Sequence, residues 1–143
     1  MDWILNDGGR AGAGFKGSAG DCVVRAIAIA AEIPYAEVYR AVAAVNATYR
    51  GRGAKGERSA RNGTYVRGAA FKRYMASIGW SWTPTMRIGS GCQVHLVAAE
   101  LPAGRHIVSL SRHYTAVVDG VIHDTHDPSR GGRRCVYGYW SKA

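Results

Sequence analysis

The dipeptide Asp119-Gly120 constrains the fold most strongly, because two runs of alternating apolar and polar residues flank it, HYTAVV and VIHDT. An Asp-Gly pair in this setting is the strongest short-range signal for a β-hairpin with a two-residue turn. Such a turn pairs Thr115 with Asp124 and makes His113 a diagonal neighbour of Asp124 on the same face of the hairpin. We therefore expect the Asp124 carboxylate to lie within reach of the His113 imidazole.

Short segments rich in β-branched and aromatic residues fill the second half of the chain and favour further strands. They are WSWTPT, RHIVSL, HYTAVVD, VIHDT and RCVYGYW. The first half shows helical periodicity instead. Because helices come first and strands follow, we expect an α+β fold in which N-terminal helices pack on one face of a C-terminal antiparallel sheet. The chain of 143 residues has the size of one domain, so residues 1–143 are expected to form a single domain.

Three helices are expected before residue 80. The first is DCVVRAIAIAAE, whose apolar residues fit a mostly buried helix with Asp21 as its N-cap. The second begins at Pro34 and runs through YAEVYRAVAAVNA. The third covers residues 65–78, with Thr64 as its cap and Gly79 as its stop. The apolar positions of this third helix are Val66, Ala70, Tyr74 and Ile78.

The composition favours a water-soluble globular protein. Hydrophobic residues make up 47% and charged residues 20%, and no apolar run approaches the roughly 20 residues of a membrane span, so no membrane partner is expected. The N-terminal MDWILNDGGR lacks the basic and apolar regions of a secretory signal, which predicts a cytoplasmic protein, or one in the host cytoplasm if a phage encodes it. The three cysteines are too few and too scattered for a disulfide framework or structural zinc, so at least one free thiol is expected.

A formal charge of +9 predicts attraction to polyanions and acidic surfaces. Much of the excess lies in one glycine-rich segment without apolar periodicity, which carries Arg50, Arg52, Lys55, Arg58 and Arg61. We interpret this segment as a solvated loop. Because no aromatic residues are interleaved with these charges, any nucleic-acid binding through Arg50–Arg61 is expected to be weak and independent of base sequence.

Cys22 falls in the first turn of the first predicted helix. The unpaired N–H groups and the helix dipole at that position favour the thiolate, which is a nucleophile at neutral pH, and the same N–H groups can stabilise an oxyanion. A cysteine at a helix start also commonly fills space, and it is the presence of His113 and Asp124 that favours catalysis here. The three residues suggest a triad in which Cys22 is the nucleophile, His113 the base and Asp124 the residue that orients the imidazole.

A Gly-Asp-Cys sequence that opens an apolar helix, a His at the start of a late strand and an Asp on the next strand resemble the papain-like cysteine peptidases. The resemblance covers residues 16–28 and 105–128 and is strongest to the bacteriocin-processing branch and to small stand-alone chains of phages and bacteria. It implies a papain-like fold and a cysteine protease or related thiol hydrolase, acting on a peptide, isopeptide or side-chain amide through a thioacyl-enzyme intermediate. It further implies a protein or peptide substrate and no cofactor.

Two positions depart from the family pattern. Papain-like enzymes usually carry a Gln six residues before the cysteine as an oxyanion donor, whereas this chain has Lys16, which can donate only as a mobile point charge. The Asp that precedes a proline is Asp127, so it is the alternative third member of the triad. Strand parity directs Asp127 away from His113 unless a bulge intervenes, and this favours Asp124.

Residue types that ligate metals follow the turn, namely His123, Asp124, His126 and Asp127. On a strand, however, His123 and His126 face opposite sides, so no metal site is expected. His95 and His106 have no paired acid and are expected to be ordinary histidines. Aromatic residues near the C-terminus are expected to pack in the core, or alternatively to form a wall of a substrate groove, and they are Trp80, Trp82, Tyr137, Tyr139 and Trp140.

Two rival functions share this framework. A transferase would use the same triad with an amine in place of water, and the sequence does not separate it from a hydrolase. A non-enzymatic papain-like module would instead bind nucleic acid or an acidic partner through its basic loop.

Overall fold

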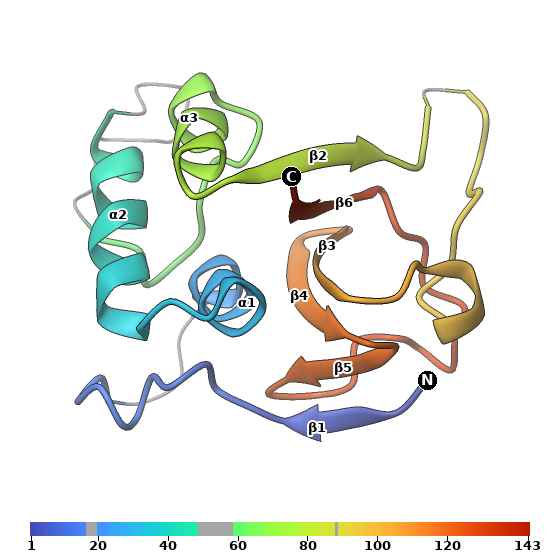
Figure 1. The fold of residues 1–143 in the computed structure, drawn as a ribbon, viewed down its shortest axis with the longest axis horizontal. Coiled ribbons are helices and arrows are strands. Elements are labelled where there is room, and N and C mark those ends of the chain that lie inside the picture. The colour runs from blue at the N-terminus through green and yellow to red at the C-terminus, as the bar shows by residue number, and fades with distance from the viewer. Residues whose placement is uncertain (17–19, 49–58, 88) are drawn as a thin grey trace.

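The computed structural model describes residues 1–16, 20–48, 59–87 and 89–143, which form an α+β fold (Figure 1). The helices within these residues are α1 (Cys22–Ala31), α2 (Tyr35–Thr48) and α3 (Ala69–Ser77), with a short 3-10 helix, η1 (Ala98–Glu100). The strands are β1 (Trp3–Leu5), β2 (Trp80–Pro84), β3 (Arg105–Leu110), β4 (His113–Val118), β5 (Val121–Asp124) and β6 (Gly138–Lys142). None of the described helices has the length and apolar character needed to cross a bilayer.

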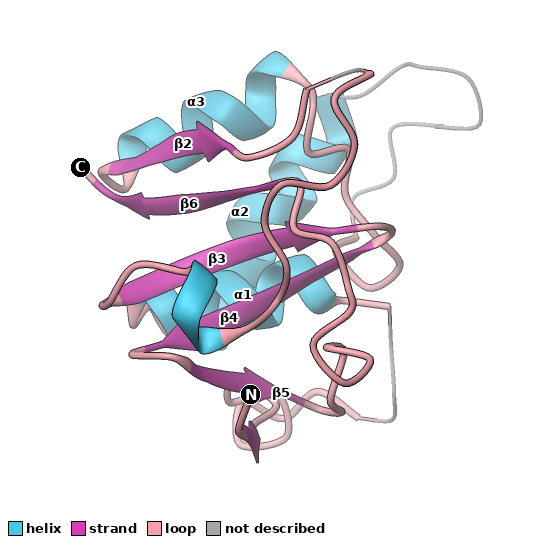
Figure 2. Cartoon of the chain, turned by 90° about the vertical axis from the view of Figure 1, so that its right-hand side faces the viewer, coloured by secondary structure: helices cyan, strands magenta, loops and turns pink. Residues whose placement is uncertain are grey.

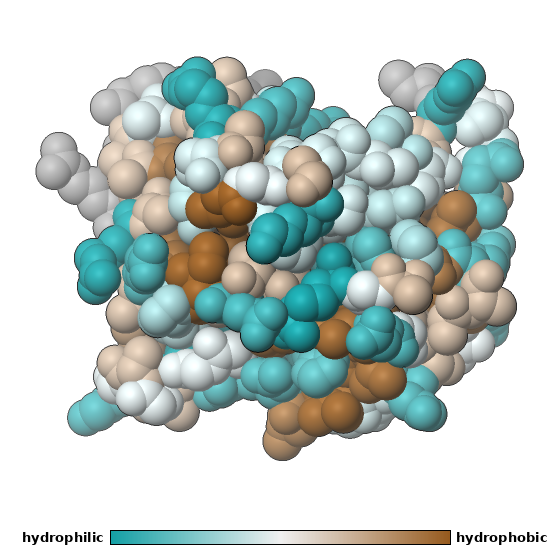
Figure 3. Space-filling model, viewed as in Figure 1, coloured by the Kyte–Doolittle hydropathy of each residue, from teal (hydrophilic) through white to brown (hydrophobic). Residues whose placement is uncertain are grey.

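The sheet is mixed, which corrects the prediction of an antiparallel sheet. Its strand order is β1-β5-β4-β3-β6-β2, and β1 runs parallel to β5 while the other neighbours are antiparallel. Three residues are too short a run to reveal β1 by alternation, and its partner comes from the far end of the sequence. This strand places Leu5 beside Asp124 in the register. Figure 3 shows hydrophobic side chains gathered along this edge, where Ile4 and Leu5 are 51% and 72% exposed.

The hairpin of β4 and β5 has the predicted register. Val118 pairs with Val121, so Asp119 and Gly120 alone form the turn. Their φ angles are +48° and +79°, as expected for the type I′ turn that Asp-Gly pairs favour. The backbone N–H of Gly104 donates to the Asp119 carboxylate at 2.8 Å and holds the turn against the chain before β3.

Helix α1 lies between the sheet and α2, as Figures 1 and 2 show from two sides. Its residues from Val23 to Ala30 are all buried, because its sequence is apolar around most of the helix. A second core fills the opposite face of the sheet, beneath η1 and the loops that lie in front of the strands in Figure 2. Its buried members are Leu96, Leu101, Val108, Leu110, Val117, Ile122 and Val136. Both faces of β4 are therefore packed, which fixes the strand that begins with His113.

Helix α3 begins later than predicted. The residues from Tyr65 to Gly68 form a turn closed by a bond from the Gly68 N–H to the Tyr65 carbonyl, and Gly68 is the N-cap in place of Thr64. The buried face consists of Phe71 and Met75, one position along from the face predicted. The predicted stop is confirmed, since Gly79 has φ +84°.

A disulfide joins Cys92 to Cys135 across 43 residues of sequence. An antiparallel bridge between His95 and Cys135 aligns the two segments and brings the sulfurs together, which spacing alone does not predict. Cys22 is the free cysteine, as expected for at least one of the three.

Candidate active site

Cys22 is the first residue of α1 and lies half-buried beside the start of β4. The backbone N–H of Tyr114 points at its Sγ atom, 3.5 Å away. The packing of α1 on β4 thus brings together residues separated by 92 positions in sequence. This places Cys22 next to His113, the neighbour of Tyr114.

Asp21 occupies the N-cap position, but its carboxylate does not cap the helix as predicted. The side chain is completely buried and pairs with the guanidinium groups of Arg10 and Arg25 and with the hydroxyl of Tyr35. Burial and the hydrogen bond to Asp21 raise the pKa of Tyr35, so this hydroxyl stays protonated and donates. In the arginine pairs both partners are charged, whereas a backbone N–H at the N-cap is a neutral donor, which explains the exchange. The cluster ties the N-terminal loop to the start of α1 and so positions Cys22.

His113 and Asp124 are in direct contact, as the hairpin register predicted. The Nε2 atom of His113 lies 2.7 Å from Oδ2 of Asp124, and the Thr115 hydroxyl donates to the same oxygen at 2.7 Å. The Thr125 backbone N–H donates to Oδ1 at 2.7 Å, and Arg25 lies 3.7 Å from that oxygen. The carboxylate is therefore fixed on both oxygens, and because Nε2 is used here, Nδ1 is the ring nitrogen of His113 that can serve the thiol.

The surroundings of Cys22 favour the thiolate. Burial alone would raise the pKa of Cys22, but hydrogen bonds from His113 and the Tyr114 N–H, together with the charges of His113 and Arg25, outweigh it and lower that pKa. A lowered thiol pKa is what a nucleophilic cysteine requires near neutral pH.

The surroundings of His113 favour the imidazolium. Burial alone would lower the pKa of His113, yet the hydrogen bonds and charges of Asp124 and Cys22 raise it to about 9. Burial would likewise raise the pKa of Asp124, and the bonds from His113, Thr115 and the Thr125 N–H lower it instead. The shifts thus favour the thiolate form of Cys22, the imidazolium form of His113 and the carboxylate form of Asp124.

A cavity of about 670 Å³ opens at Cys22 and His113. Three arginines line it, namely Arg10, Arg25 and Arg112. Of these, Arg10 and Arg25 pair with the buried Asp21, and Arg112 is exposed at the turn before β4. The lining also contains Asp7 and Asp21, so its arginines outnumber its carboxylates by one. This excess positive charge favours the negative charge that a carbonyl oxygen acquires when a thiolate attacks it.

The structure does not bring Lys16 into this cavity. The Lys16 side chain is exposed, and its carbonyl accepts a bond from Arg10 at 3.0 Å. The residue that lines the cavity with an amide side chain is Asn62, which lies beside Gly20 in a parallel bridge. Sequence reasoning missed Asn62, because only the tertiary pairing of Gly20 with Asn62 reveals its position.

The alternative third residue, Asp127, lies elsewhere. Its Oδ1 atom accepts the Ser129 backbone N–H at 2.9 Å, in a turn after β5. The strand parity that favoured Asp124 therefore agrees with the regular pairing of β4 with β5 and with the contact of Asp124 with His113.

The remaining histidines have separate environments. His123 contacts the Asn6 amide at 3.3 Å, and His95 lies 3.4 Å from Glu100, an acidic partner that the sequence did not indicate. The ligand atoms of His113, Asp124 and His126 lie within 4.8 Å of one another, the one such group found among the described residues. Asp124 already bonds His113 and Thr115, which accounts for its position without a metal ion, and the absence of a metal stays a prediction.

The predicted basic loop falls largely outside the described residues. Positions 50–58 are not described, and Arg61 is exposed next to the cavity residue Asn62. The proposed weak nucleic-acid binding through Arg50–Arg61 stays a prediction.

Comparisons with models of known protein families, with curated proteins and with solved structures found no match. The function of the site is therefore inferred from its own geometry and chemistry.

Proposed function

We propose that this protein is a cysteine-nucleophile hydrolase with a papain-like fold, which cleaves an amide bond of a protein or peptide. The observation that carries the proposal is the grouping of Cys22 with the start of β4, where the Tyr114 N–H points at Sγ and the neighbouring His113 bonds Asp124 at 2.7 Å, so that the pKa of the thiol is lowered and that of the imidazole is raised. A helix that presents its first residue to the start of a sheet strand supports the papain-like assignment.

The first chemical step is acylation. The Cys22 thiolate attacks the carbonyl carbon, and the electron pair of the C=O bond moves onto the oxygen. The imidazolium of His113 then donates its Nδ1 proton to the leaving amine as the C–N bond breaks, and the carbonyl reforms as a thioester. Asp124 holds Nε2 throughout, so the imidazole keeps the orientation that both proton transfers need.

The second step is deacylation. Neutral His113 removes a proton from water, the resulting hydroxide attacks the thioester, and collapse of the tetrahedral intermediate expels the Cys22 thiolate. The product leaves as a carboxylic acid, and His113 retains the proton that restores the ion pair. An amine in place of water would give a transferase with the same residues.

Reaction with a thiol electrophile tests the nucleophile. We expect the native protein to be alkylated at Cys22 alone, because Cys92 and Cys135 are in a disulfide. His113→Ala should slow the labelling by about tenfold or more near pH 6, since it removes the cation that stabilises the thiolate. The matched control is His95→Ala. His95 precedes Leu96 of the second core, which lies on the face of the sheet opposite α1 and Cys22. If Cys22 is alkylated equally fast in both variants, and no faster than an ordinary exposed thiol, the proposal is contradicted.

Trapping of the acyl-enzyme tests the reaction. An activated ester should give a burst of product equal to the enzyme concentration, and hydroxylamine should accelerate turnover if deacylation is slow. Mass spectrometry then locates the acyl group on Cys22, and Cys22→Ala abolishes the burst. A faster reaction with a peptide amine than with water would identify a transferase.

The charge of +9 keeps a non-enzymatic reading as the alternative, in which the basic loop binds nucleic acid or an acidic partner. A chain without thiol reactivity that binds DNA or RNA in a strongly salt-dependent manner would favour this alternative.

A further inference from the structure

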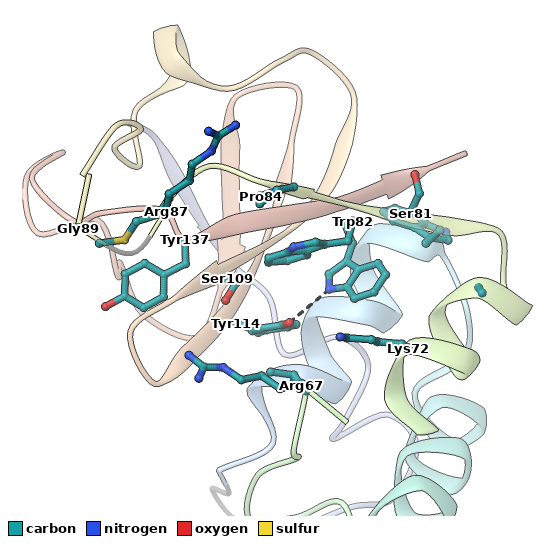
Figure 4. Close-up of a pocket in the computed structure, with 15 residues that line it drawn as sticks. Arg67, Lys72, Ser81, Trp82, Pro84, Arg87, Gly89, Ser109, Tyr114 and Tyr137 are labelled. Atoms are coloured by element: carbon teal, nitrogen blue, oxygen red, sulfur yellow. Dashed lines mark hydrogen bonds between the residues drawn. The ribbon is translucent and has the colours of Figure 1, made fainter. Parts of the chain in front are cut away.

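A second, larger cavity of about 910 Å³ lies on the other side of Tyr114, and the chemistry proposed above does not use it (Figure 4). Its walls come from α3, β2 and β6 and from the loop after β2. Aromatic side chains dominate the lining, namely Trp80, Trp82, Tyr114, Tyr137 and Trp140. We call this space the aromatic cavity.

The floor of the aromatic cavity is rigid. The indole N–H of Trp140 donates to the Tyr114 hydroxyl at 3.3 Å, and both side chains are only 6% exposed. Phe71 packs edge-on against both rings, with centroids 6.3 and 6.0 Å away. A floor with its polar atoms paired and its rings locked offers a preformed apolar surface, which lowers the entropic cost of binding.

One wall of the cavity is open. Trp82 packs on Trp140 with ring centroids 5.3 Å apart but remains 40% exposed. A large apolar ring that leans over a buried aromatic floor and still faces solvent is typical of a binding site for an apolar side chain.

The charged residues that line the cavity are cations. Arg67, Lys72 and Arg87 belong to its lining, and the described lining residues include neither Asp nor Glu. In Figure 4, Lys72 extends from α3 toward the rings, Arg67 lies below Tyr114 on the loop before α3, and Arg87 points away from the rings at the outer margin, on the loop after β2. An apolar floor with cations at its margin is complementary to an apolar group flanked by carboxylates.

The aromatic cavity connects with the candidate active site through two shared pieces of chain. The Tyr114 N–H points at Cys22 Sγ, while its ring lies in the aromatic cavity. The segment 62–67 borders both spaces, because Asn62 lines the cavity at Cys22 and Arg67 lines the aromatic one. A chain anchored in the aromatic cavity can therefore pass along this segment to the nucleophile.

We propose that the aromatic cavity binds an apolar or aromatic side chain of a peptide segment with acidic residues on either side of it, and so selects acidic peptides for Cys22. This selectivity rests on the proposed hydrolase function, but the binding does not. The ring geometry favours a peptide over a nucleic acid, because Trp82 is inclined by 54° to Trp140 and the floor rings are buried, so the cavity lacks an open platform for stacked bases.

Binding of a fluorescent pentapeptide with one Phe between four acidic residues tests the proposal, with Cys22→Ala as the protein so that no cleavage interferes. Fluorescence anisotropy should show binding that weakens as salt is added. Trp82→Ala should weaken it by about tenfold or more, whereas Trp3→Ala, which removes an indole of similar exposure on β1, should not. Arg67→Gln with Arg87→Gln should weaken it by roughly two- to fivefold per charge, and Arg40→Gln on α2 is the matched control.

The outcomes separate the two proposals. Equal binding of a pentapeptide with Lys and Arg in place of the acids, or equal losses in the control variants, overturns the acidic-peptide site. A single-stranded oligonucleotide that displaces the peptide and depends on Trp82 more strongly than the peptide does also overturns it. Peptide binding that follows the expected pattern in a chain whose Cys22 proves unreactive supports the aromatic cavity as a peptide site and removes the hydrolase.

Discussion

The carboxylate of Asp124 holds Nε2 of His113 at 2.7 Å across adjacent strands of one hairpin. The relationship follows from the two-residue turn, since one residue more or fewer between β4 and β5 would direct Asp124 to the other face. Thr115 and the Thr125 N–H hold the same carboxylate, so it has little freedom to release the ring. The hairpin thus fixes the imidazole orientation before any substrate binds.

The role of Asp124 is testable by comparing it with Asp127. Asp124→Asn keeps the size of the side chain but removes the charge that favours the imidazolium, so turnover should fall by about ten- to a hundredfold. This loss is smaller than the roughly 10⁴-fold effect in a serine triad, because the thiolate and imidazolium already form an ion pair. Asp127→Asn should cost far less, since its carboxylate bonds Ser129. Turnover, with circular dichroism to verify folding, decides the order, and a larger loss from Asp127→Asn would show that the assignment is wrong.

The pH dependence of Cys22 alkylation should show a reactive window. The pKa of Cys22 is lowered and that of His113 is raised to about 9, so the ion pair persists above the first and below the second. Alkylation should therefore already be fast at acidic to neutral pH, well below the ordinary thiol pKa of about 8.5. His113→Gln should shift the midpoint of the rate profile upward. Stopped-flow labelling from about pH 5 to pH 9 measures it, and an unshifted midpoint in the native protein would contradict the ion pair.

Local rules predicted the parts of the site that lie within one segment. The turn chemistry of Asp119-Gly120 determines the register of His113 and Asp124, and the apolar pattern after Cys22 determines the helix. These features depend on residues a few positions apart, so the sequence contains what is needed to predict them.

Packing determined the parts that the sequence did not reveal. The parallel pairing of β1 with β5, the bridge of Gly20 with Asn62 and the Cys92–Cys135 disulfide all join distant segments. A three-residue strand has no recognisable period, and the role of Asn62 depends on where its neighbours are packed. The prediction that the Asp21 side chain caps α1 was wrong for a related reason, because the carboxylate instead forms tertiary ion pairs with Arg10 and Arg25.

The stability of the protein should depend less on pH in the native chain than in Cys22→Ser. The pKa of His113 is about 9 in the folded protein and 6.5 in the unfolded chain. His113 therefore contributes its full stabilisation below pH 6.5, and this contribution is lost as pH rises through about 9. The lowered pKa of Cys22 works in the other direction, because the unfolded thiol stays protonated to a pKa of 9.0. The two effects offset each other, so the free energy of unfolding of the native chain should change little between about pH 6.5 and pH 9.

Cys22→Ser leaves only the His113 effect, since Asp124 still raises the imidazole pKa. Its free energy of unfolding should fall as pH rises above about 6.5, and the fall should be complete at a lower pH than the native His113 pKa of about 9, because Cys22 no longer helps to raise that pKa. Urea unfolding at several pH values measures both curves. Parallel curves for the native chain and the variant would mean that the thiolate and imidazolium are not linked.

Loss of one charge from the buried cluster at the start of α1 should destabilise the fold, because the remaining buried charges are then incompletely compensated. Asp21→Asn removes the buried counter-charge that Arg10 and Arg25, 6% and 8% exposed, share, although Arg25 still lies 3.7 Å from Asp124. Breaking such a cluster costs about 3–5 kcal/mol of unfolding free energy. The control is Asp2→Asn, an exposed position on the same N-terminal segment, which should change stability by less than about 0.5 kcal/mol. Urea unfolding compares the two, and similar small changes would show that the fold does not depend on the Asp21 charge.

The last prediction concerns the oxyanion donor. Asn62 lines the cavity at Cys22, whereas the Lys16 side chain is exposed outside that lining. A buried amide donor contributes about 10²–10³ in turnover, and because Asn62 is exposed we expect Asn62→Ala to cost about ten- to a hundredfold. Alkylation of Cys22 by iodoacetamide should be unchanged in the same variant, because that displacement forms no oxyanion on a tetrahedral carbon. The ratio of ester turnover to alkylation rate therefore isolates the donor from any effect on the thiol. Lys16→Ala should leave both rates intact, and a fall in its turnover with no fall in Asn62→Ala would reverse the assignment.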